Sequence, residues 1–142
     1  MKKYFLLVLI MIILFSCKKE DIHNNNFSAT LHFSTDTITF DTIFASIGSI
    51  TKTLIVYNHN NFDVRTNVDL RGISSAHFRM NIDGIAGNNQ SDIEIPSKDS
   101  IFIFLEVTID PSSNNTPYIL ADSLVFTTGT TKQDVDVVAW GQ

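Results

Sequence analysis

The stretch Ile101-Phe102-Ile103-Phe104-Leu105-Glu106-Val107-Thr108-Ile109 decides the fold. Successive side chains of a β-strand point to opposite faces, so the odd-numbered residues from Ile101 to Ile109 line one face without a polar interruption. The even-numbered residues begin with two phenylalanines and turn polar at Glu106. A strand with one apolar face and one mixed face is typical of a sheet that buries only one side. We therefore expect the odd-numbered residues to face the core.

Short runs rich in Val, Ile, Thr and Phe lie on both sides of this stretch, and Gly, Asn and Pro separate them. No long segment after Ala29 shows helical periodicity, and these residue types favour strands. Short strands with turn signals roughly every 8–12 residues predict an all-β, immunoglobulin-like β-sandwich of about seven to nine strands over residues 29–142. The expected strands are Leu31–Phe33, Thr37–Phe44, Thr51–Tyr57, Val64–Leu70, Phe78–Ile82, Ile93–Ile95, Ile101–Ile109, Ser123–Thr127 and Val135–Ala139, with loops at Gly87–Asn89 and Ser112–Pro117.

The amino terminus predicts a secretory signal. Two lysines follow Met1, and an apolar run extends from Tyr4 to Phe15. A basic start followed by an apolar stretch of about 7–15 residues is the secretory pattern. The run is shorter than the roughly 20 residues that a transmembrane helix needs.

The end of this run resembles a bacterial lipobox. Leu14-Phe15-Ser16-Cys17 carries the resemblance, although Phe15 is larger than the residue usual at its place. The resemblance implies that residues 1–16 are removed as a lipoprotein signal peptide and that Cys17 receives diacylglycerol and a further acyl chain such as palmitate. A buried free thiol is the commoner state of a lone cysteine, but this one stands at the signal boundary. Two or more acyl chains anchor a protein stably to a membrane.

A polar tether is expected over residues 17–28, before the sandwich. Its block Lys19-Glu20-Asp21 resembles the surface-export signal of Bacteroidetes-type lipoproteins, which implies an outer-membrane protein that faces the cell exterior. A solvated charged linker is the alternative interpretation, since any lipoprotein needs one.

The mature part resembles the Hydin-like and major-sperm-protein-like immunoglobulin folds. The resemblance rests on Phe40–Phe44, on Gly48-Ser49 and on Leu54–Asn58, and it extends over about Leu31 to Trp140. It also matches the amino-terminal module of uncharacterised Bacteroidetes-type surface lipoproteins, in which a β-helix-like repeat often follows. The chain is thus either the module alone or a truncated reading frame. The family implies a binding or spacer role and brings no catalytic residues.

Four tripeptides share the order Asp, hydroxyl residue, aliphatic residue. They resemble an O-glycosylation sequon of exported Bacteroidetes-type proteins. The alternative is local capping at the start of strands, where Asp, Ser and Thr hydrogen-bond the backbone. The hydroxyl residues concerned are Thr37, Thr42, Ser100 and Ser123.

The chain has no recognised catalytic, phosphate-binding or calcium-binding motif. The four histidines are scattered along it, and a metal site needs converging ligands. Asp134 and Asp136 share one face of the last strand, which suits calcium, a paired-carboxylate hydrolase, or simply a solvated edge. We expect no cofactor, no metal and no enzymatic activity. A net charge of −5 lacks the basic footprint of nucleic-acid binding, and a single cysteine excludes an internal disulfide.

Phe102 and Phe104 are the candidate docking residues. Two aromatic side chains on the outward face would leave an apolar patch that monomers usually avoid. Either the loop before Phe78 covers them, or they dock a following domain or partner chain.

These predictions give a lipid-anchored, non-enzymatic binding or spacer module of the outer membrane. The lipid on Cys17 anchors it to the membrane, and its partner is a protein, a glycan or a following domain. The first alternative is a structural subunit of an envelope assembly that recruits a strand at an open sheet edge. A small glycan-active enzyme is the second, and it would need a cleft with paired carboxylates of perturbed pKa.

Overall fold

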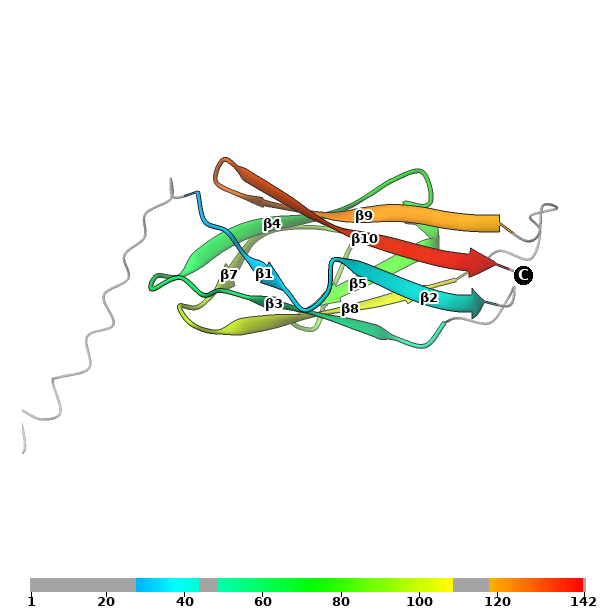
Figure 1. Ribbon diagram of the computed structural model, residues 1–142, viewed down its shortest axis with the longest axis horizontal. Helices are drawn as coiled ribbons and strands as arrows, with labels where there is room; N and C mark the ends of the chain where they lie inside the picture. Colours follow the sequence, from blue (N-terminus) through cyan, green and yellow to red (C-terminus); the bar gives the residue numbers. More distant parts are fainter. Residues whose placement is uncertain (1–27, 44–48, 109–117, 142) are drawn as a thin grey trace, which may run out of the picture.

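The computed structural model of the chain describes residues 28–43, 49–108 and 118–141 (Figure 1). The expected signal peptide, Cys17 and the tether up to residue 27 lie outside these residues. Within the described ranges, no helix is long and apolar enough to cross a bilayer.

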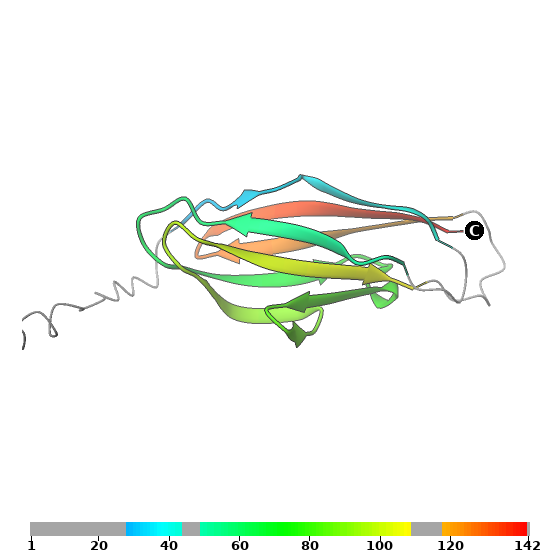
Figure 2. The same ribbon diagram turned by 90° about the horizontal axis from the view of Figure 1, so that it is seen from below.

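Two five-stranded sheets stack face to face, which confirms the predicted β-sandwich (Figure 2). A single 3₁₀ turn, η1 (Ser75–His77), is the helical element among the described residues. In spatial order, the first sheet holds β1 (His32–Phe33), β3 (Lys52–Tyr57), β8 (Ser100–Val107), β5 (Phe78–Ile82) and β6 (Ile85–Ala86). The second sheet holds β2 (Thr37–Ile43), β10 (Thr131–Gly141), β9 (Tyr118–Thr128), β4 (Val64–Arg71) and β7 (Asn89–Ile95).

The core lies between the two sheets and is built from alternating residues of the long strands. In β8 the odd-numbered side chains face inward, as the sequence predicts. Ile103, Leu105 and Val107 are fully buried. Aromatic rings contact each other across the two sheets. The ring centroid of Phe33 in β1 lies 4.7 Å from that of Phe126 in β9. The buried set is Ala29, Leu31, Ile38, Phe40, Leu54, Val56, Val64, Val68, Leu70, Phe78, Met80, Ile82, Ile95, Ile103, Leu105, Val107, Leu120, Leu124, Phe126, Val135, Val137 and Ala139.

The first strand of the sandwich changes sheets. β1 pairs antiparallel with β3, and after a short crossing β2 pairs parallel with β10. Ser34 N donates to Ile55 O at 3.0 Å on one side of the crossing, and Asp136 N donates to Asp36 O at 3.0 Å on the other. Between them, Thr35 Oγ1 bonds both the N–H and the carbonyl of Thr37. One continuous segment therefore straps both sheets together.

Several elements differ from the prediction, and β10 already begins at Thr131 and not at Val135. β9 begins at Tyr118 and not at Ser123, because all eleven residues of β10 pair with it. β7 begins at Asn89, within a segment expected to be a loop, because Asn89 and Gln90 pair with β4. The two-residue strand β6 was not expected. In each case a partner strand overrides the weak local preference of the sequence for a strand.

The sheet edges are short or irregular. β1 and β6 have two residues each. The register of β7 shifts against β4, and Asp92 within it has φ 59°. On β2, the Thr35 hydroxyl caps Thr37, and the register shifts after Phe40. Such features disfavour strand addition. The longest edge strands among the described residues are β2 and β7, with seven residues each.

β10 lies between β2 and β9. The expectation that Asp134 and Asp136 protect an open edge was wrong for Asp136, because the parallel pairing with β2 covers β10 from Asp136 to Gly141. Both aspartates do face solvent, as the alternation predicts.

Candidate functional site

The outer face of the first sheet carries an exposed aromatic patch. Phe102 and Phe104 of β8 are 48% and 41% exposed. In register, Phe102 stands opposite Ile55 of β3, and Phe104 stands between Thr53 of β3 and Asn81 of β5. We call Ile55, Phe102 and Phe104 the aromatic face.

The segment before Phe78 does not cover this face. Its backbone turns the other way, where Ser74 N donates to Asp122 Oδ1 of the second sheet at 3.1 Å. The Nδ1 atom of His77 lies 3.2 Å from the carbonyl oxygen of Thr108, the residue after β8. Both phenylalanines accordingly remain open to solvent.

Two histidines meet at one end of the same sheet face. His32 of β1 stands opposite Tyr57 in register, and the chain reaches His59 two residues after Tyr57. The rings of His32 and His59 stack with centroids 4.5 Å apart, and the Tyr57 ring lies 5.8 Å from His59. Sequence separation concealed this pair, because the contact depends on the pairing of β1 with β3.

Asn58 fixes the loop that carries His59. Its side chain is fully buried, and Nδ2 donates to the carbonyls of Phe62, Ile95 and Pro96 at 2.9–3.1 Å. Its Oδ1 accepts from the backbone and side-chain nitrogens of Asn60. A single buried amide thus makes hydrogen bonds to five polar groups of two loops, three carbonyls and two nitrogens.

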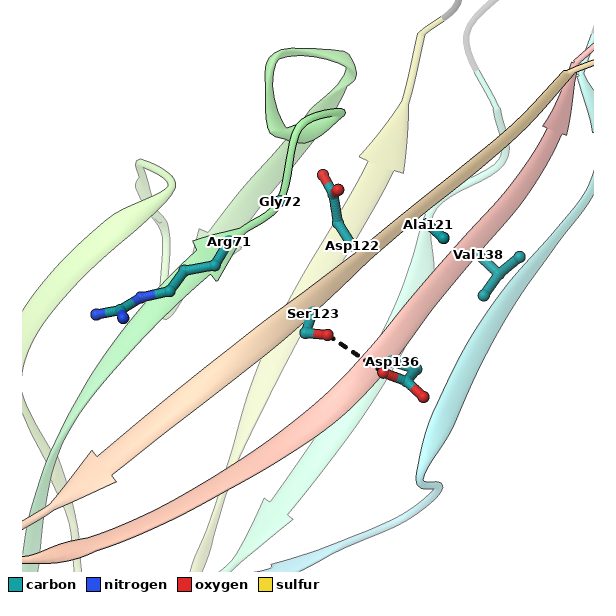
Figure 3. A pocket seen from close by; sticks show the side chains of 7 residues that line it. All are labelled: Arg71, Gly72, Ala121, Asp122, Ser123, Asp136 and Val138. Carbon is teal, nitrogen blue, oxygen red and sulfur yellow. Dashed lines mark hydrogen bonds between the residues drawn. The ribbon is translucent and has the colours of Figure 1, made fainter.

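A polar pocket of about 310 Å³ opens on the second sheet where β4 ends (Figure 3). β4 pairs with β9 only as far as Arg71 and Ser123, so β9 continues past it without that neighbour. The lining residues are Arg71, Gly72, Ala121, Asp122, Ser123, Asp136 and Val138.

Asp122 is the buried carboxyl group of this pocket, with 6% of the residue exposed. Its side chain points toward the turn after Gly72, away from Ser123 and Asp136 (Figure 3). Oδ1 accepts from Ser74 N, whereas Oδ2 is buried and has no hydrogen-bond partner among the described residues. Burial raises the pKa of the Asp122 carboxyl above its usual range, against the opposing effects of the Ser74 N–H and of His77.

Both carboxyl groups of the pocket accept a hydrogen bond from within the chain. Asp122 is committed to Ser74, and Asp136 accepts a hydrogen bond from Ser123 Oγ at 3.2 Å. The pocket therefore does not present two open carboxylates to a substrate. In the described ranges, no three His, Cys, Asp or Glu side chains are grouped as metal ligands would be. Sequence inspection missed Asp122, because a strand aspartate that faces inward looks like any other strand polar residue.

The four hydroxyl residues occupy different positions in their strands. Thr37 and Ser100 begin β2 and β8, and Ser100 N donates to Asp99 Oδ1 at 2.7 Å, as local capping requires. Thr42 and Ser123 lie inside strands, so the expectation that all four stand at strand starts was wrong. Ser123 is half-buried and its hydroxyl is bonded to Asp136.

The comparisons with known proteins agree with the fold. No protein-family model matches the chain, and no curated protein matches it by sequence. Among solved structures, a family 123 glycoside hydrolase from Clostridium perfringens matches with TM-score 0.57 and 11% identity, over 81% of this chain and 27% of that one.

Two further structures are similar. A Porphyromonas gingivalis protein of unknown function matches with TM-score 0.53 and 16% identity, over 78% of this chain and 47% of that one. The PapD-like domain 7 of human CEP192 matches with TM-score 0.50 and 12% identity, over 89% and 92%. The chain spans less than half the length of the first two. These likenesses show an immunoglobulin-like β-sandwich fold.

Proposed function

We propose that the protein is a lipid-anchored, non-enzymatic binding module that docks a protein partner on the aromatic face. The observation that carries the proposal is the exposure of Phe102 and Phe104 side by side on a regular sheet face. Aromatic side chains concentrate binding energy at interfaces. The E. coli chaperone DraB, whose fold is similar at TM-score 0.53 and 6% identity, supports a binding role by analogy only.

The double change Phe102→Ser and Phe104→Ser tests the docking face. Because both rings are exposed, we expect a loss of stability of no more than about 1 kcal/mol. We also expect partner binding to fall sharply, since each ring is an interface anchor. The measurements are thermal unfolding and photo-crosslinking in cells, with a benzophenone amino acid at position 104.

The matched control is the pair Ile119→Ser and Trp140→Ser. These residues are also exposed and stand opposite each other, on the outer face of the second sheet. We expect a photo-crosslinker at position 119 to give no protein adduct, while position 104 gives one. Unfolding of the Phe102/Phe104 variant, or equal adducts at both positions, would count against docking.

The anchor is proposed at Cys17, since the only cysteine stands at the end of the apolar run. Metabolic labelling with an alkyne fatty acid should tag the full chain, and Cys17→Ala should abolish the tag. Two acyl chains contribute about 0.8 kcal/mol per buried CH₂, so the variant should also leave the membrane fraction. A Cys17→Ala protein that still labels would refute the anchor.

Exposure on the cell exterior is proposed from Lys19-Glu20-Asp21. Protease treatment of intact cells should remove the protein, and the change of Glu20 and Asp21 to Ala should leave it protected inside. An unchanged digestion pattern would show that the acidic pair serves only as a tether.

A further inference from the structure

We propose that the outer face of β9 and β10 binds a short, neutral oligosaccharide. The site extends from the polar pocket to the exposed pair Ile119 and Trp140. It belongs to the second sheet, whereas the aromatic face belongs to the first, so the inference is independent of the docking function. We call the following six residues the glycan site: Ile119, Ala121, Ser123, Asp136, Val138 and Trp140.

Three cross-strand pairs give the glycan site its length. In order along the strands, the pairs are Asp136 with Ser123, Val138 with Ala121, and Trp140 with Ile119. Strand residues rise by 3.3–3.4 Å each, so the first and third pairs are about 13 Å apart. The middle pair has shorter side chains than Trp140 at one end and Asp136 at the other. A depression of this length suits two or three linked sugar rings.

The pocket widens this depression on the side of β4. β4 ends at Arg71, and Gly72 has no side chain to cover the neighbouring part of β9. The pocket volume of about 310 Å³ lies at the lower end of the range for small-molecule sites, roughly 300–1,000 Å³. All residues of β10 pair with β9, so the site is rigid before a ligand arrives. A preorganised site loses less conformational freedom on binding.

Trp140 supplies an aromatic platform at one end of the glycan site. Trp140 is 41% exposed, and Ile119 beside it is 64% exposed. An indole offers a flat apolar face with negative charge density and one N–H donor at its rim. One face of a pyranose ring presents C–H groups, whose partial positive charge suits that aromatic face, while its hydroxyl groups radiate from the ring edge. A sugar can therefore cover the indole and keep its hydroxyl groups hydrated.

Asp136 supplies the hydrogen-bond acceptors at the other end. Its Oδ1 accepts from Ser123 Oγ at 3.2 Å (Figure 3). A carboxylate has about four lone-pair positions, so this bond leaves acceptor positions for sugar hydroxyl groups. Asp136 is exposed and Ser123 is half-buried, so both are within reach of a ligand in the depression.

The charges around the polar end favour a neutral sugar. Asp134 lies on the same face of β10 as Asp136 and is also exposed. The Arg71 guanidinium bonds to Asp69 at 2.8 Å and extends away from Ser123 and Asp136 (Figure 3). The carboxylates on β10 therefore repel a carboxylated or sulfated sugar, and Arg71 does not offset them at the site.

The test is a titration of the full chain, in a detergent without sugar headgroups, with cellotriose, maltotriose and the anionic trigalacturonate. Trp140 is the single tryptophan of the chain, so its fluorescence reports on the glycan site alone. We expect a neutral trimer to shift the emission of Trp140. At low salt, calorimetry should show that this trimer binds at least tenfold more tightly than trigalacturonate.

Three variants separate the parts of the site. Trp140→Ala should weaken binding of the neutral trimer at least tenfold in calorimetry. Ala121→Leu fills the depression at an exposed position and leaves Trp140 and Asp136 in place, so it should abolish binding in a folded protein. Asp136→Asn keeps the shape of the side chain and removes its charge. It should therefore bring the affinity for trigalacturonate close to that for the neutral trimer.

The Phe102/Phe104 variant is the matched control, because its changes lie on the other sheet. It should bind the neutral trimer like the native chain, so failure of the docking function and failure of glycan binding are distinguishable. The proposal would be overturned if neither neutral trimer bound, or if Trp140→Ala and Ala121→Leu both bound like the native chain. Tighter binding of trilysine than of either trimer would also overturn it, because the site would then be one for basic peptides.

Discussion

Replacing Gly72 with alanine is expected to lower the free energy of unfolding by about 3–5 kcal/mol, which combines backbone strain with overpacking. Gly72 has φ 149°, a conformation that residues with a Cβ rarely adopt. An added Cβ would also lie 1.8 Å from Asp122 Oδ1 and 2.3 Å from its Cγ. The carboxyl group cannot retreat without losing its hydrogen bond to Ser74 N.

Two comparisons separate the backbone strain at Gly72 from the overpacking against Asp122. Gly84 has φ 83° and open space where a Cβ would stand, so Gly84→Ala should cost only the strain of about 1–3 kcal/mol. In an Asp122→Ala background, Gly72→Ala should cost less than in the native chain, because the carboxyl group is gone. Chemical denaturation measures all of these variants. Equal losses for Gly72→Ala and Gly84→Ala would show that the contact with Asp122 is unimportant.

Replacing Asn58 with alanine is expected to cost about 3–5 kcal/mol, a size reached when a buried polar network is broken. The change strips the hydrogen bonds from the carbonyls of Phe62, Ile95 and Pro96 and from the Asn60 nitrogens. A buried polar group left without a partner costs about 1–3 kcal/mol.

The neighbouring Asn61 provides the control, because it is exposed in the same loop. Asn61→Ala should change stability by less than about 0.5 kcal/mol. The Asn58 variant should also separate the His32 and His59 rings, visible as altered imidazole signals in NMR spectra. A variant as stable as the native chain would show that solvent replaces the lost hydrogen bonds.

The sandwich was predictable because its strands alternate strongly. The odd-numbered residues of the 101–109 stretch allow one buried face, and the structure places 103, 105 and 107 there. β7 was harder to predict, since Asn89 and Gln90 disfavour strands. Its start depends on pairing with β4, which local sequence does not encode.

Some features of the candidate site follow from a single strand, whereas others depend on how the strands pair. Exposure of Phe102 and Phe104 follows from alternation within one strand, so the sequence sufficed to name them. The His32–His59 contact, the Asn58 network and the Gly72–Asp122 contact join residues from different strands or loops. Their detection needs the order and register of the strands, and no short motif marks them.

The strap formed by β1 and β2 has a mechanical consequence. β2 and β10 run parallel from the pair Thr37–Asp136 to the pair Phe40–Ala139. The chain enters the sandwich at one end of its long axis and leaves at the other (Figure 1). A pull between the two ends of the sandwich would draw these strands in opposite directions along their length. The hydrogen bonds between them would then bear the force together, in shear, and not one after another as in a zipper.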